Sequence, residues 1–333
     1  MRDAVILVAG GAGYIGSHMV RLLRLRGHAV LVLDNLSTGY KDALLGTPLI
    51  EGSIGDAPLL NRLFSEYTVD AVINFASLIA VGESVQRPDT YYRNNVAETL
   101  VLLEAMVEHK VSRFLFSSTA AVYGHPDQIP VEESATKNPI SPYGRSKWMI
   151  EQVLGDLDNA YGFRSVALRY FNAAGADPDG ELGERHNPET HLIPLALQVA
   201  SGRKKYLEVY GDDYPTTDGT CVRDYIHVVD LCDAHLLALN HLLAGGVSKA
   251  FNLGNGKGFS VREVIRTAQR VTGKAIHFRM APRRAGDPPA LVASSQLIQQ
   301  ELGWQPKRAG LDTIIEDAWR FERRINSGDS LLP

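Results

Sequence analysis

The most constraining feature of the sequence is a short apolar run that ends in a glycine-rich segment. The run Val5–Ala9 leads directly into Gly10-Gly11-Ala12-Gly13-Tyr14-Ile15-Gly16, and a helical pattern begins near Ser17. A Cβ at Gly10, Gly13 or Gly16 would crowd the turn, a bound phosphate or the strand. The start of the following helix offers free N–H groups and a positive dipole end to an anionic pyrophosphate. This strand–loop–helix context favours a dinucleotide-binding loop over a purely structural turn.

A carboxylate at the end of the second predicted strand, Asp34, supports this interpretation. It can accept hydrogen bonds from the ribose hydroxyls of an adenosine, and it would repel a 2′-phosphate. No arginine follows it directly, so the pattern favours NAD over NADP as cofactor. The simpler alternative is a helix-capping aspartate beside a tight turn.

The first half of the chain alternates short apolar runs with helical patterns. The predicted strands are Ala4–Ala9, Ala29–Leu33, Ala71–Ala76, Phe114–Phe116 and Val166–Tyr170. The predicted helices are Ser17–Arg26, Pro58–Tyr67, Val96–His109 and Tyr143–Tyr161. Continuous apolar strands with intervening helices indicate a parallel sheet that is covered on both faces. We therefore predict an α/β fold, a doubly wound parallel sheet (Rossmann-like), over residues 1–171.

The second half is expected to form a smaller C-terminal α/β substrate lobe over residues 172–333. It begins with a loop rich in glycine, proline, aspartate and asparagine at 172–190. The predicted helices are Ile193–Ala200, Val229–Leu243, Val261–Val271 and Leu311–Ile325, and the predicted strands are Leu207–Tyr210, Ala250–Leu253 and Ile276–Phe278. One segment, about 225–245, is expected to return to the first domain.

Composition excludes several classes of function. Lys plus Arg is 34 and Asp plus Glu is 38, a net charge of 34 − 38 = −4, so neither nucleic acid nor an anionic membrane is expected as a partner. The two cysteines rule out a disulfide scaffold, and they suit a reduced, cytoplasmic setting. No apolar stretch is long enough to predict a transmembrane helix. His186 and His191 show no H-x-x-x-H spacing, so no metal site is expected.

A tyrosine and a lysine four residues apart form the candidate reactive pair. Ser141 and Pro142 suit the N-cap and first position of a helix, which places Tyr143 and Lys147 on one helix face. A free phenol is a poor base at neutral pH, but a neighbouring ammonium and a nicotinamide cation would stabilise its phenolate. Thr119, at the end of a buried strand, offers a hydroxyl to the same proton transfer. Taken alone, the pair is also common on surface helices, and a strand-end hydroxyl is ordinary polarity.

Seven sequence blocks together carry a family resemblance. They are GGAGYIGSH (Gly10–His18), DNLSTG (Asp34–Gly39), AVGESVQRPDTYYRNNV (Ala80–Val96), SPYGRSK (Ser141–Lys147), LRYFNAAGA (Leu168–Ala176), YGDDYPTTDGTCVRDYIHVVDL (Tyr210–Leu231) and APRRAGDPPA (Ala281–Ala290). The chain resembles the UDP-glucose 4-epimerases of the extended short-chain dehydrogenase/reductase superfamily over nearly its whole length.

This resemblance implies roles for individual residues. Tyr143 would be the base, Lys147 its partner and Thr119 the hydroxyl relay. NAD would be held by Gly10, Gly13, Tyr14, Ile15, Gly16, Asp34, Asn35, Ser53, Ile54, Phe75, Asn95, Tyr143, Lys147 and Tyr170. The UDP-sugar would be held by Thr119, Asn172, His191, Leu192, Tyr210, Arg223, Arg284, Asp287 and Leu291.

The resemblance also implies the reaction, a reversible 4-epimerisation of UDP-glucose and UDP-galactose. The sugar C4 is transiently oxidised by bound NAD, the 4-keto sugar rotates about its link to the diphosphate, and hydride returns to the other face. Relatives form dimers, so we expect a homodimer built on the apolar helices Thr99–Met106 and Met149–Leu154, with Trp148.

Departures from the family pattern raise specific expectations. Ile79 replaces a common lysine beside the cofactor phosphates and Ser53 replaces a common aspartate near the adenine, so NAD retention is expected to be weaker. His191 stands where asparagine is common near the UDP site; it can donate to phosphate or simply pack at a helix start. Leu291 replaces a bulky tyrosine of some relatives, and we hypothesise that the sugar pocket also admits UDP-N-acetylhexosamines.

Three other functions remain open. UDP-pentose 4-epimerases share the same blocks. A nucleotide-sugar dehydratase or decarboxylase is less favoured, because dehydratases carry an acid pair after the hydroxyl residue and Ala120-Ala121 stand there. A non-catalytic NAD-sensing protein is a remote alternative, because such proteins typically lose the tyrosine or lysine.

Overall fold

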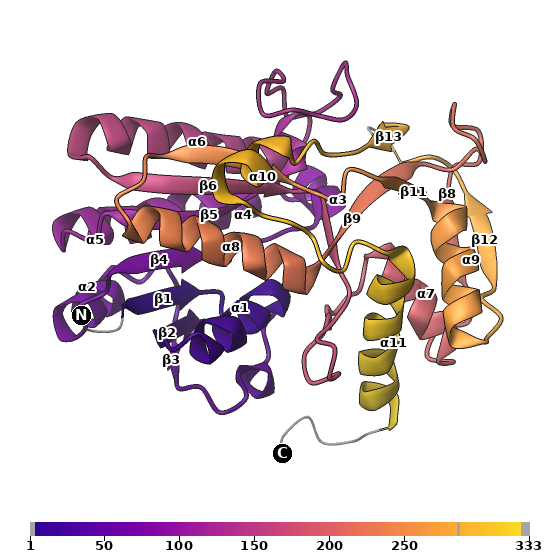
Figure 1. Ribbon diagram of the computed structural model, residues 1–333, viewed down its shortest axis with the longest axis horizontal. Coiled ribbons are helices and arrows are strands. Elements are labelled where there is room, and N and C mark those ends of the chain that lie inside the picture. Colours follow the sequence, from indigo (N-terminus) through magenta and orange to yellow (C-terminus); the bar gives the residue numbers. More distant parts are fainter. Residues whose placement is uncertain (1–3, 285–286, 328–333) are drawn as a thin grey trace.

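The computed structural model describes residues 4–284 and 287–327, and its largest feature is a seven-stranded parallel sheet (Figure 1). The strand order is β10-β6-β5-β4-β1-β2-β3. These strands are β1 (Val5–Ala9), β2 (Ala29–Asp34), β3 (Leu49–Glu51), β4 (Ala71–Asn74), β5 (Arg113–Thr119), β6 (Arg164–Tyr170) and β10 (Lys249–Leu253). The order reverses between β1 and β4, and ligands of open α/β sheets bind outside the carboxyl ends of the strands at such a point. The predicted doubly wound fold is confirmed.

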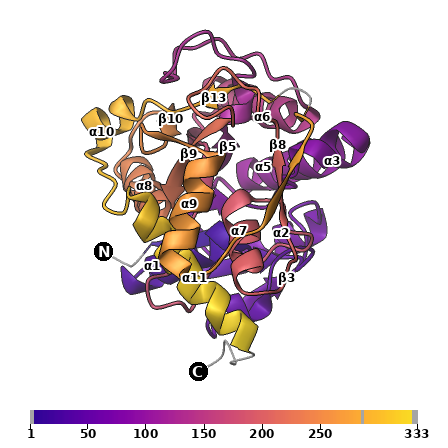
Figure 2. The ribbon, with the colours of Figure 1, turned by 90° about the vertical axis from the view of Figure 1, so that its right-hand side faces the viewer.

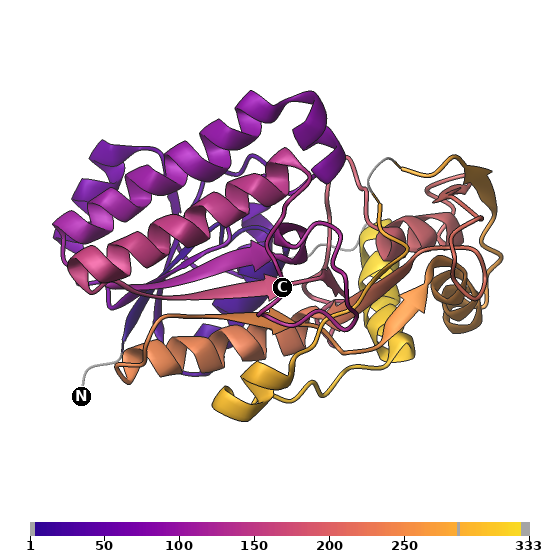
Figure 3. The same ribbon diagram turned by 90° about the horizontal axis from the view of Figure 1, so that it is seen from above.

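Helices cover both faces of this sheet, because the side chains of each strand alternate between two cores. In β1, Ile6 and Val8 enter one core, whereas Leu7 and Ala9 enter the other. The first core is closed by α1 (Tyr14–Leu25), α8 (Val228–Leu243) and α10 (Gln296–Leu302), and the second by α2 (Ala57–Glu66), α5 (Thr99–Glu108) and α6 (Pro142–Tyr161). Figure 3 shows the sheet between α5 and α6 on one side and α8 and α10 on the other.

A smaller lobe lies at the carboxyl-terminal edge of the sheet (Figure 2). One of its sheets has the order β11-β9-β13 with β7 also paired to β9, and a second pairs β12 with β8. Its elements are β7 (Asn172–Ala174), α7 (Leu192–Ala200), β8 (Leu207–Tyr210), β9 (Val222–His227), β11 (Gly258–Ser260), α9 (Val261–Thr272), β12 (Phe278–Ala281), β13 (Ala290–Leu291) and α11 (Leu311–Ser327). Side chains of α7, α9 and α11, such as Leu197, Ile265 and Ile314, form its own core.

Two strand predictions in the second half need correction. The run Ala250–Leu253 was expected in the smaller lobe, but it lies in β10, which pairs in parallel with β6 at the edge of the large sheet. Phe251 and Leu253 are fully buried in the first core, which explains why the segment returns to that sheet. The third predicted strand, Ile276–Phe278, begins only at Phe278, because Ile276 instead fills the core of the smaller lobe.

The chain passes between the two lobes repeatedly. It enters the smaller lobe after β6, returns at the junction of β9 and α8, leaves after β10, and returns again for α10. The remaining helical segments of the first half are short. They are α3 (Val81–Gln86), α4 (Pro88–Tyr92), a π-helical turn (Arg93–Glu98) and 3₁₀ turns at Lys41–Leu44 and Ala120–Val122. Among the described residues, none of the helices has the length and apolarity needed to span a membrane.

Candidate active site

The glycine loop between β1 and α1 is shaped by close backbone contacts. Gly10 has a φ of +75°, and a Cβ on it would lie 2.5 Å from the main-chain nitrogen of Ala76. A Cβ on Gly16 would lie 2.1 Å from the carbonyl oxygen of Gly10. Gly13 is the N-cap of α1, and no side chain caps this helix. The free first turn and the cradle without Cβ atoms fit a dinucleotide pyrophosphate.

Asp34 is fixed at the rim of this loop. One carboxylate oxygen accepts from the N–H of Ala12 at 2.9 Å, and the other accepts from the N–H of Leu36 at 2.8 Å. Each oxygen keeps a further lone pair, so the carboxylate can also accept from ribose hydroxyls. The neighbouring Asn35 is exposed, and its side-chain oxygen accepts from the N–H of Ser37.

Tyr14 and Ile15 begin α1 and act largely through their side chains inside the protein. The Tyr14 hydroxyl donates to the carbonyl oxygen of Gly175 at 2.7 Å, which links α1 to the first segment of the smaller lobe. Ile15 packs on the first core, together with Phe75 and Tyr170. These contacts hold the glycine loop in place. Because both side chains are engaged inside the protein, Tyr14 and Ile15 can offer only their main-chain N–H groups to an anionic ligand.

The far side of the expected cofactor site contains Ser53 and Asn95. The Ser53 hydroxyl donates to Glu98 at 2.6 Å and accepts from the N–H of Gly55, so it is already engaged inside the protein. The Asn95 side chain makes two hydrogen bonds to the main chain of Leu78, at 2.9 and 3.0 Å. Asn95 lies in the π-helical turn, and such turns are frequent at functional sites.

Two apolar side chains complete this side. Ile54 is buried in the second core, and the Phe75 ring packs 4.9 Å from the ring of His235. Ile79, the residue that replaces a common lysine, is 43% exposed. The apolar side chain of Ile79 offers no donor to a phosphate.

The tyrosine–lysine pair lies at the start of α6, as the spacing predicted. The Ser141 hydroxyl caps the helix by accepting from the N–H of Gly144, and Pro142 occupies its first turn. Tyr143 is 9% exposed, and the Thr119 side chain at the end of β5 lies close enough to its phenol to lower the pKa of that group. This geometry joins the phenol and the second hydroxyl at one point beside the carboxyl edge of the sheet.

Lys147 lies one turn further along α6 and is almost fully buried. Its ammonium donates to the carbonyl oxygen of Ser117 at 2.9 Å and lies 4.9 Å from the centre of the Phe116 ring. Burial lowers the pKa of Lys147 to about 7, against an opposing effect of Glu151. Burial raises the pKa of Tyr143, and the nearby Thr119 side chain offsets only part of this rise. In the protein alone, therefore, desolvation outweighs any stabilisation of the phenolate.

Glu151 supports the pair and was missed by the sequence analysis. It forms a 2.5 Å ion pair with Arg169 on β6, and both side chains are only 5% exposed. The same carboxylate accepts from the Ser118 hydroxyl next to Thr119. The signal was present in the sequence, because Tyr143, Lys147 and Glu151 follow at intervals of four on one helix face.

A second group of predicted residues gathers where β9 meets β13. Arg223 donates to Asp287 at 3.2 Å, and Leu291 pairs with Arg223 across the two strands. Arg284 lies over the Tyr210 ring, with 4.0 Å between its guanidinium carbon and the ring centre. Ala285 and Gly286, within the resemblance block that begins at Ala281, lie outside the described residues.

Asn172 links this group to the large sheet. Its side-chain nitrogen donates to the carbonyl oxygen of Asp224 in β9 at 2.9 Å. Leu291 packs against the buried cluster of Val122, Tyr123 and Val131, close to the 3₁₀ turn that follows Thr119. The guanidinium groups of Arg223 and Arg284 provide hydrogen-bond donors for a diphosphate.

His191 and Leu192 stand at the start of α7. His191 is the N-cap residue, but its ring makes no cap bond and instead lies 2.8 Å from Glu184 and 3.0 Å from Glu189. Burial lowers the pKa of His191, but the two carboxylates outweigh this and raise it to about 10. With His186 these residues form a close cluster of four side chains, which the search for H-x-x-x-H spacing missed.

Comparisons with known proteins agree with this geometry. The model of the NAD dependent epimerase/dehydratase family matches residues 6–254. A UDP-glucose 4-epimerase from Halalkalibacterium halodurans is 52% identical over 325 residues, which are 98% of this chain and 97% of the relative. The chain belongs to the UDP-glucose 4-epimerase branch of this family.

Solved structures of other members extend the likeness to the whole fold. The UDP-glucose 4-epimerase of Brucella ovis, in complex with NAD, is 51% identical with a TM-score of 0.93, over 96% of this chain and 99% of that one. The enzyme of Bifidobacterium longum, in complex with NAD+ and UDP, is 39% identical with a TM-score of 0.92, over 98% and 100% of the two chains. The NAD dependence of the family confirms the cofactor predicted from Asp34.

Proposed function

We propose that the protein interconverts UDP-glucose and UDP-galactose by 4-epimerisation with bound NAD. The observation that carries this proposal is the meeting of Tyr143, at the start of α6, with Thr119, at the carboxyl end of β5, where the Thr119 side chain is close enough to the phenol to lower its pKa. Ala120 and Ala121 follow in the 3₁₀ turn and bring no acid for a dehydration step. Epimerisation needs only a proton acceptor at the sugar oxygen and a hydride acceptor at C4.

The chain supplies the proton chemistry of this reaction. Bound NAD supplies the hydride acceptor and, after the sugar has turned, the hydride donor. Tyr143 takes the proton of the sugar 4-hydroxyl and returns it to the 4-keto oxygen, while Thr119 holds that oxygen by a hydrogen bond. Lys147, anchored on Ser117, stabilises the phenolate by its charge. Burial raises the pKa of Tyr143, and this rise is overcome when the charge of Lys147 and that of bound NAD face the phenol. Removal of the proton is therefore coupled to the binding of NAD.

The predicted UDP contacts are proposed to bear most of the substrate affinity. Arg223 and Arg284 bind the diphosphate, Asp287 accepts from the uridine ribose, and Asn172 and Tyr210 orient the nucleotide. A tightly held nucleotide leaves the sugar free to present either face. Leu291 packs against the cluster that contains Val122 and Tyr123, just after Thr119, and this place supports a position at the sugar end. Its short apolar side chain supports acceptance of UDP-N-acetylhexosamines, and UDP-pentoses stay alternative substrates because pentose 4-epimerases share the same sequence blocks.

Two features support looser NAD binding than the family pattern implies. Ser53 gives its hydroxyl to Glu98, and Ile79 provides no cation for the phosphates. The remaining predicted contacts, from the glycine loop, Asp34, Ile54, Phe75, Asn95 and Tyr170, surround the carboxyl ends of β1, β2, β4 and β6. We propose that residues 1–171, with α8, β10 and α10, form the NAD lobe, and that the rest of the chain binds the UDP-sugar.

A homodimer in the cytoplasm is part of the proposal. Most of the apolar residues expected at the dimer face, including Leu102, Met106 and Ile150, are buried in the core of the chain itself, so that prediction needs revision. Val85 on α3 and Met149 on α6 remain 63% and 42% exposed, and they support a dimer face formed by these helices. Sedimentation that detects only monomer at micromolar concentration would contradict the dimer. The cytoplasmic setting is supported by two unpaired, buried cysteines.

Proton NMR of the purified protein with UDP-galactose tests the activity. We expect the anomeric signal of UDP-glucose to grow faster when NAD is added, or to appear only when NAD is added. Tyr143→Phe should slow conversion by about 10²–10⁴-fold, because it removes only the hydroxyl. Conversion by the variant at the wild-type rate would refute the role of Tyr143. Absence of conversion by the wild type, with NAD present, would refute the hexose reaction and direct the same assay to N-acetylated and pentose substrates.

A further inference from the structure

Four metal-ligating side chains meet in the segment between β7 and α7. Glu184, His186, Glu189 and His191 each present one donor atom, and all four donors lie within 4.8 Å of one another. The spacing E-x-H-x-x-E-x-H brings them from eight consecutive residues, so a single loop encloses the cluster. None of these four side chains takes part in the proposed proton transfer, and only His191 has another expected role, as a UDP-sugar contact implied by the resemblance.

The cluster is close in size to the ligand set of one small metal ion. Nδ1 of His191 lies 2.8 Å from Glu184 Oε1 and 3.0 Å from Glu189 Oε1. Nδ1 of His186 lies 3.0 Å from Glu184 Oε1 and 3.8 Å from Glu189 Oε2. Ligands at about 2.0–2.2 Å from a tetrahedral Zn²⁺ lie roughly 3.3–3.6 Å from one another, so small shifts would complete the coordination.

Hydrogen bonding alone leaves the cluster incomplete. The Glu189 side chain is only 4% exposed, and its Oε2 atom faces His186 yet makes no hydrogen bond. Nδ1 of His186 is also buried without a hydrogen bond of normal geometry. Each ring nitrogen carries at most one proton but faces two carboxylates, so protons cannot satisfy every oxygen. Buried polar atoms without partners are rare, and an ion between them is one of the few explanations.

We propose that Glu184, His186, Glu189 and His191 bind one divalent transition-metal ion, Zn²⁺, in a closed structural site. Two carboxylates balance the charge of the ion, and two neutral imidazoles complete a four-ligand set that suits zinc. This site goes beyond the proposed epimerase activity, because four protein ligands fill the coordination sphere and leave no position for a substrate. It assigns His191 to the ion in place of the UDP-sugar contact that the resemblance implies.

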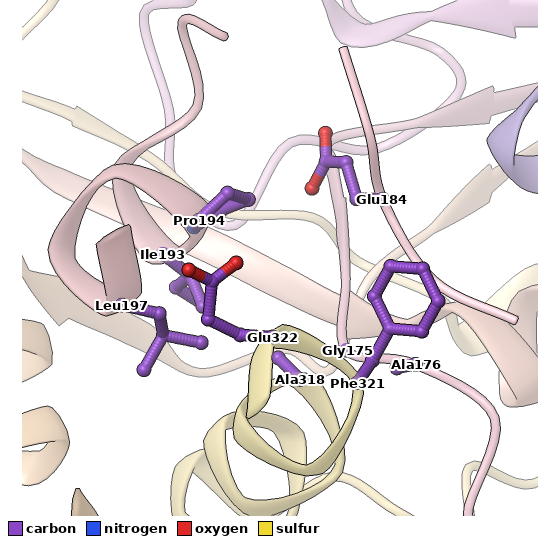
Figure 4. Close-up of a pocket in the computed structure, with 9 residues that line it drawn as sticks. All are labelled: Gly175, Ala176, Glu184, Ile193, Pro194, Leu197, Ala318, Phe321 and Glu322. Carbon is purple, nitrogen blue, oxygen red and sulfur yellow. The ribbon is translucent and has the colours of Figure 1, made fainter. Parts of the chain in front are cut away.

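The surroundings indicate what the ion would hold together. His191 is the N-cap residue of α7. The His186 ring packs edge-on against Tyr14 at the start of α1, with 6.4 Å between the ring centres. Glu184 also borders a cavity between α7 and α11 that is lined on its other side by Phe321 and Glu322 (Figure 4). The bound ion would fix the start of α7 against the cofactor loop.

Metal content and metal-dependent stability test this proposal without any sugar substrate. The full chain, with its affinity tag removed, is purified without chelator and measured by plasma mass spectrometry. We expect one zinc per chain. Removal with a chelator should lower the melting temperature, and added Zn²⁺ should restore it. Co²⁺ in place of zinc should give the visible absorption bands of a tetrahedral site.

Matched variants connect the metal to the cluster. Glu184→Gln and His186→Gln should each abolish zinc retention and the response of the melting temperature to Zn²⁺. Glu181→Gln removes a carboxylate from the same loop, where it pairs with Arg21, and should retain zinc. Circular dichroism identifies a variant that has failed to fold. If Glu184→Gln does not fold, His186→Gln tests the proposal instead, because the His186 side chain is partly exposed. No zinc in the wild type and no change of its melting temperature with Zn²⁺ would overturn the proposal, as would variants that bind zinc like the wild type.

Discussion

Replacement of the buried Lys147 is expected to stabilise the fold while it abolishes activity. The amine is 3% exposed, and burial lowers its pKa from 10.5 to about 7. The unfolded chain therefore binds this proton more tightly than the folded chain, which favours unfolding at any pH below 10.5. A shift of about 3.5 units at 1.36 kcal/mol each costs about 5 kcal/mol when the pH is below both values.

The cost depends on pH in a way that the variant Lys147→Met should reveal. The cost is complete below pH 7, decreases as the pH rises, and vanishes above 10.5. It amounts to about 4 kcal/mol at pH 7 and to about 1 kcal/mol at pH 9.5. The variant also leaves the Ser117 carbonyl without its donor, a loss of about 1–3 kcal/mol that does not depend on pH. We expect the variant to be more stable than the wild type at pH 7, and this advantage to fall by about 3 kcal/mol at pH 9.5.

Reversible urea unfolding at both pH values measures this difference. Both proteins must be stripped of nucleotide, because a ligand that binds only the folded state adds its own stabilisation. Lys274→Met, at an exposed position, is the control and should show no comparable change with pH. The same stability difference at pH 7 and pH 9.5 would refute the reasoning, because it would mean that the buried amine does not carry a desolvated charge.

Two further predictions concern the cofactor loop and the buried ion pair. Gly16→Ala should abolish NAD binding in a fluorescence titration, because its Cβ would lie 2.1 Å from the Gly10 carbonyl oxygen. The control is Gly155→Ala in α6, where a Cβ meets no atom within 4 Å; this variant should bind NAD normally and gain about 0.5–1 kcal/mol in stability. Glu151→Leu should lower the free energy of unfolding by about 3–5 kcal/mol, because it leaves the buried charge of Arg169 without a carboxylate to balance it. Recovery in Glu151→Leu/Arg169→Met would support this cause, and an unchanged unfolding midpoint in the single variant would exclude it.

Local patterns were sufficient to predict most of the large sheet. Its central strands contain continuous apolar runs, such as residues 71–73 of β4, since both faces are covered by helices. The glycine loop and the Tyr143–Lys147 pair were also predictable, because each is defined by spacing within one turn. Capping residues such as Ser141 and Pro142 added the start of α6.

Long-range pairing was harder to predict. The strand β10 looks like any short buried strand, and only its contact with β6, some eighty residues earlier, places it in the large sheet. The same limit applies to the site. Ser53 could be assigned to the adenine from resemblance, but its hydrogen bond to Glu98 depends on how α5 approaches β3. Glu151 and the Glu184–His191 cluster became evident only once their buried partners were known.

The repeated passage of the chain between its lobes has a consequence for protein synthesis. When residue 171 has just left the ribosome, β6 is still an open edge, and the face that α8 will cover is bare around Ile6, Val8 and Leu168. The sheet gains its last strand only after Leu253 has been made. The nascent chain therefore exposes apolar surface through most of its translation, and a fragment that ends at 171 should aggregate when it is expressed alone.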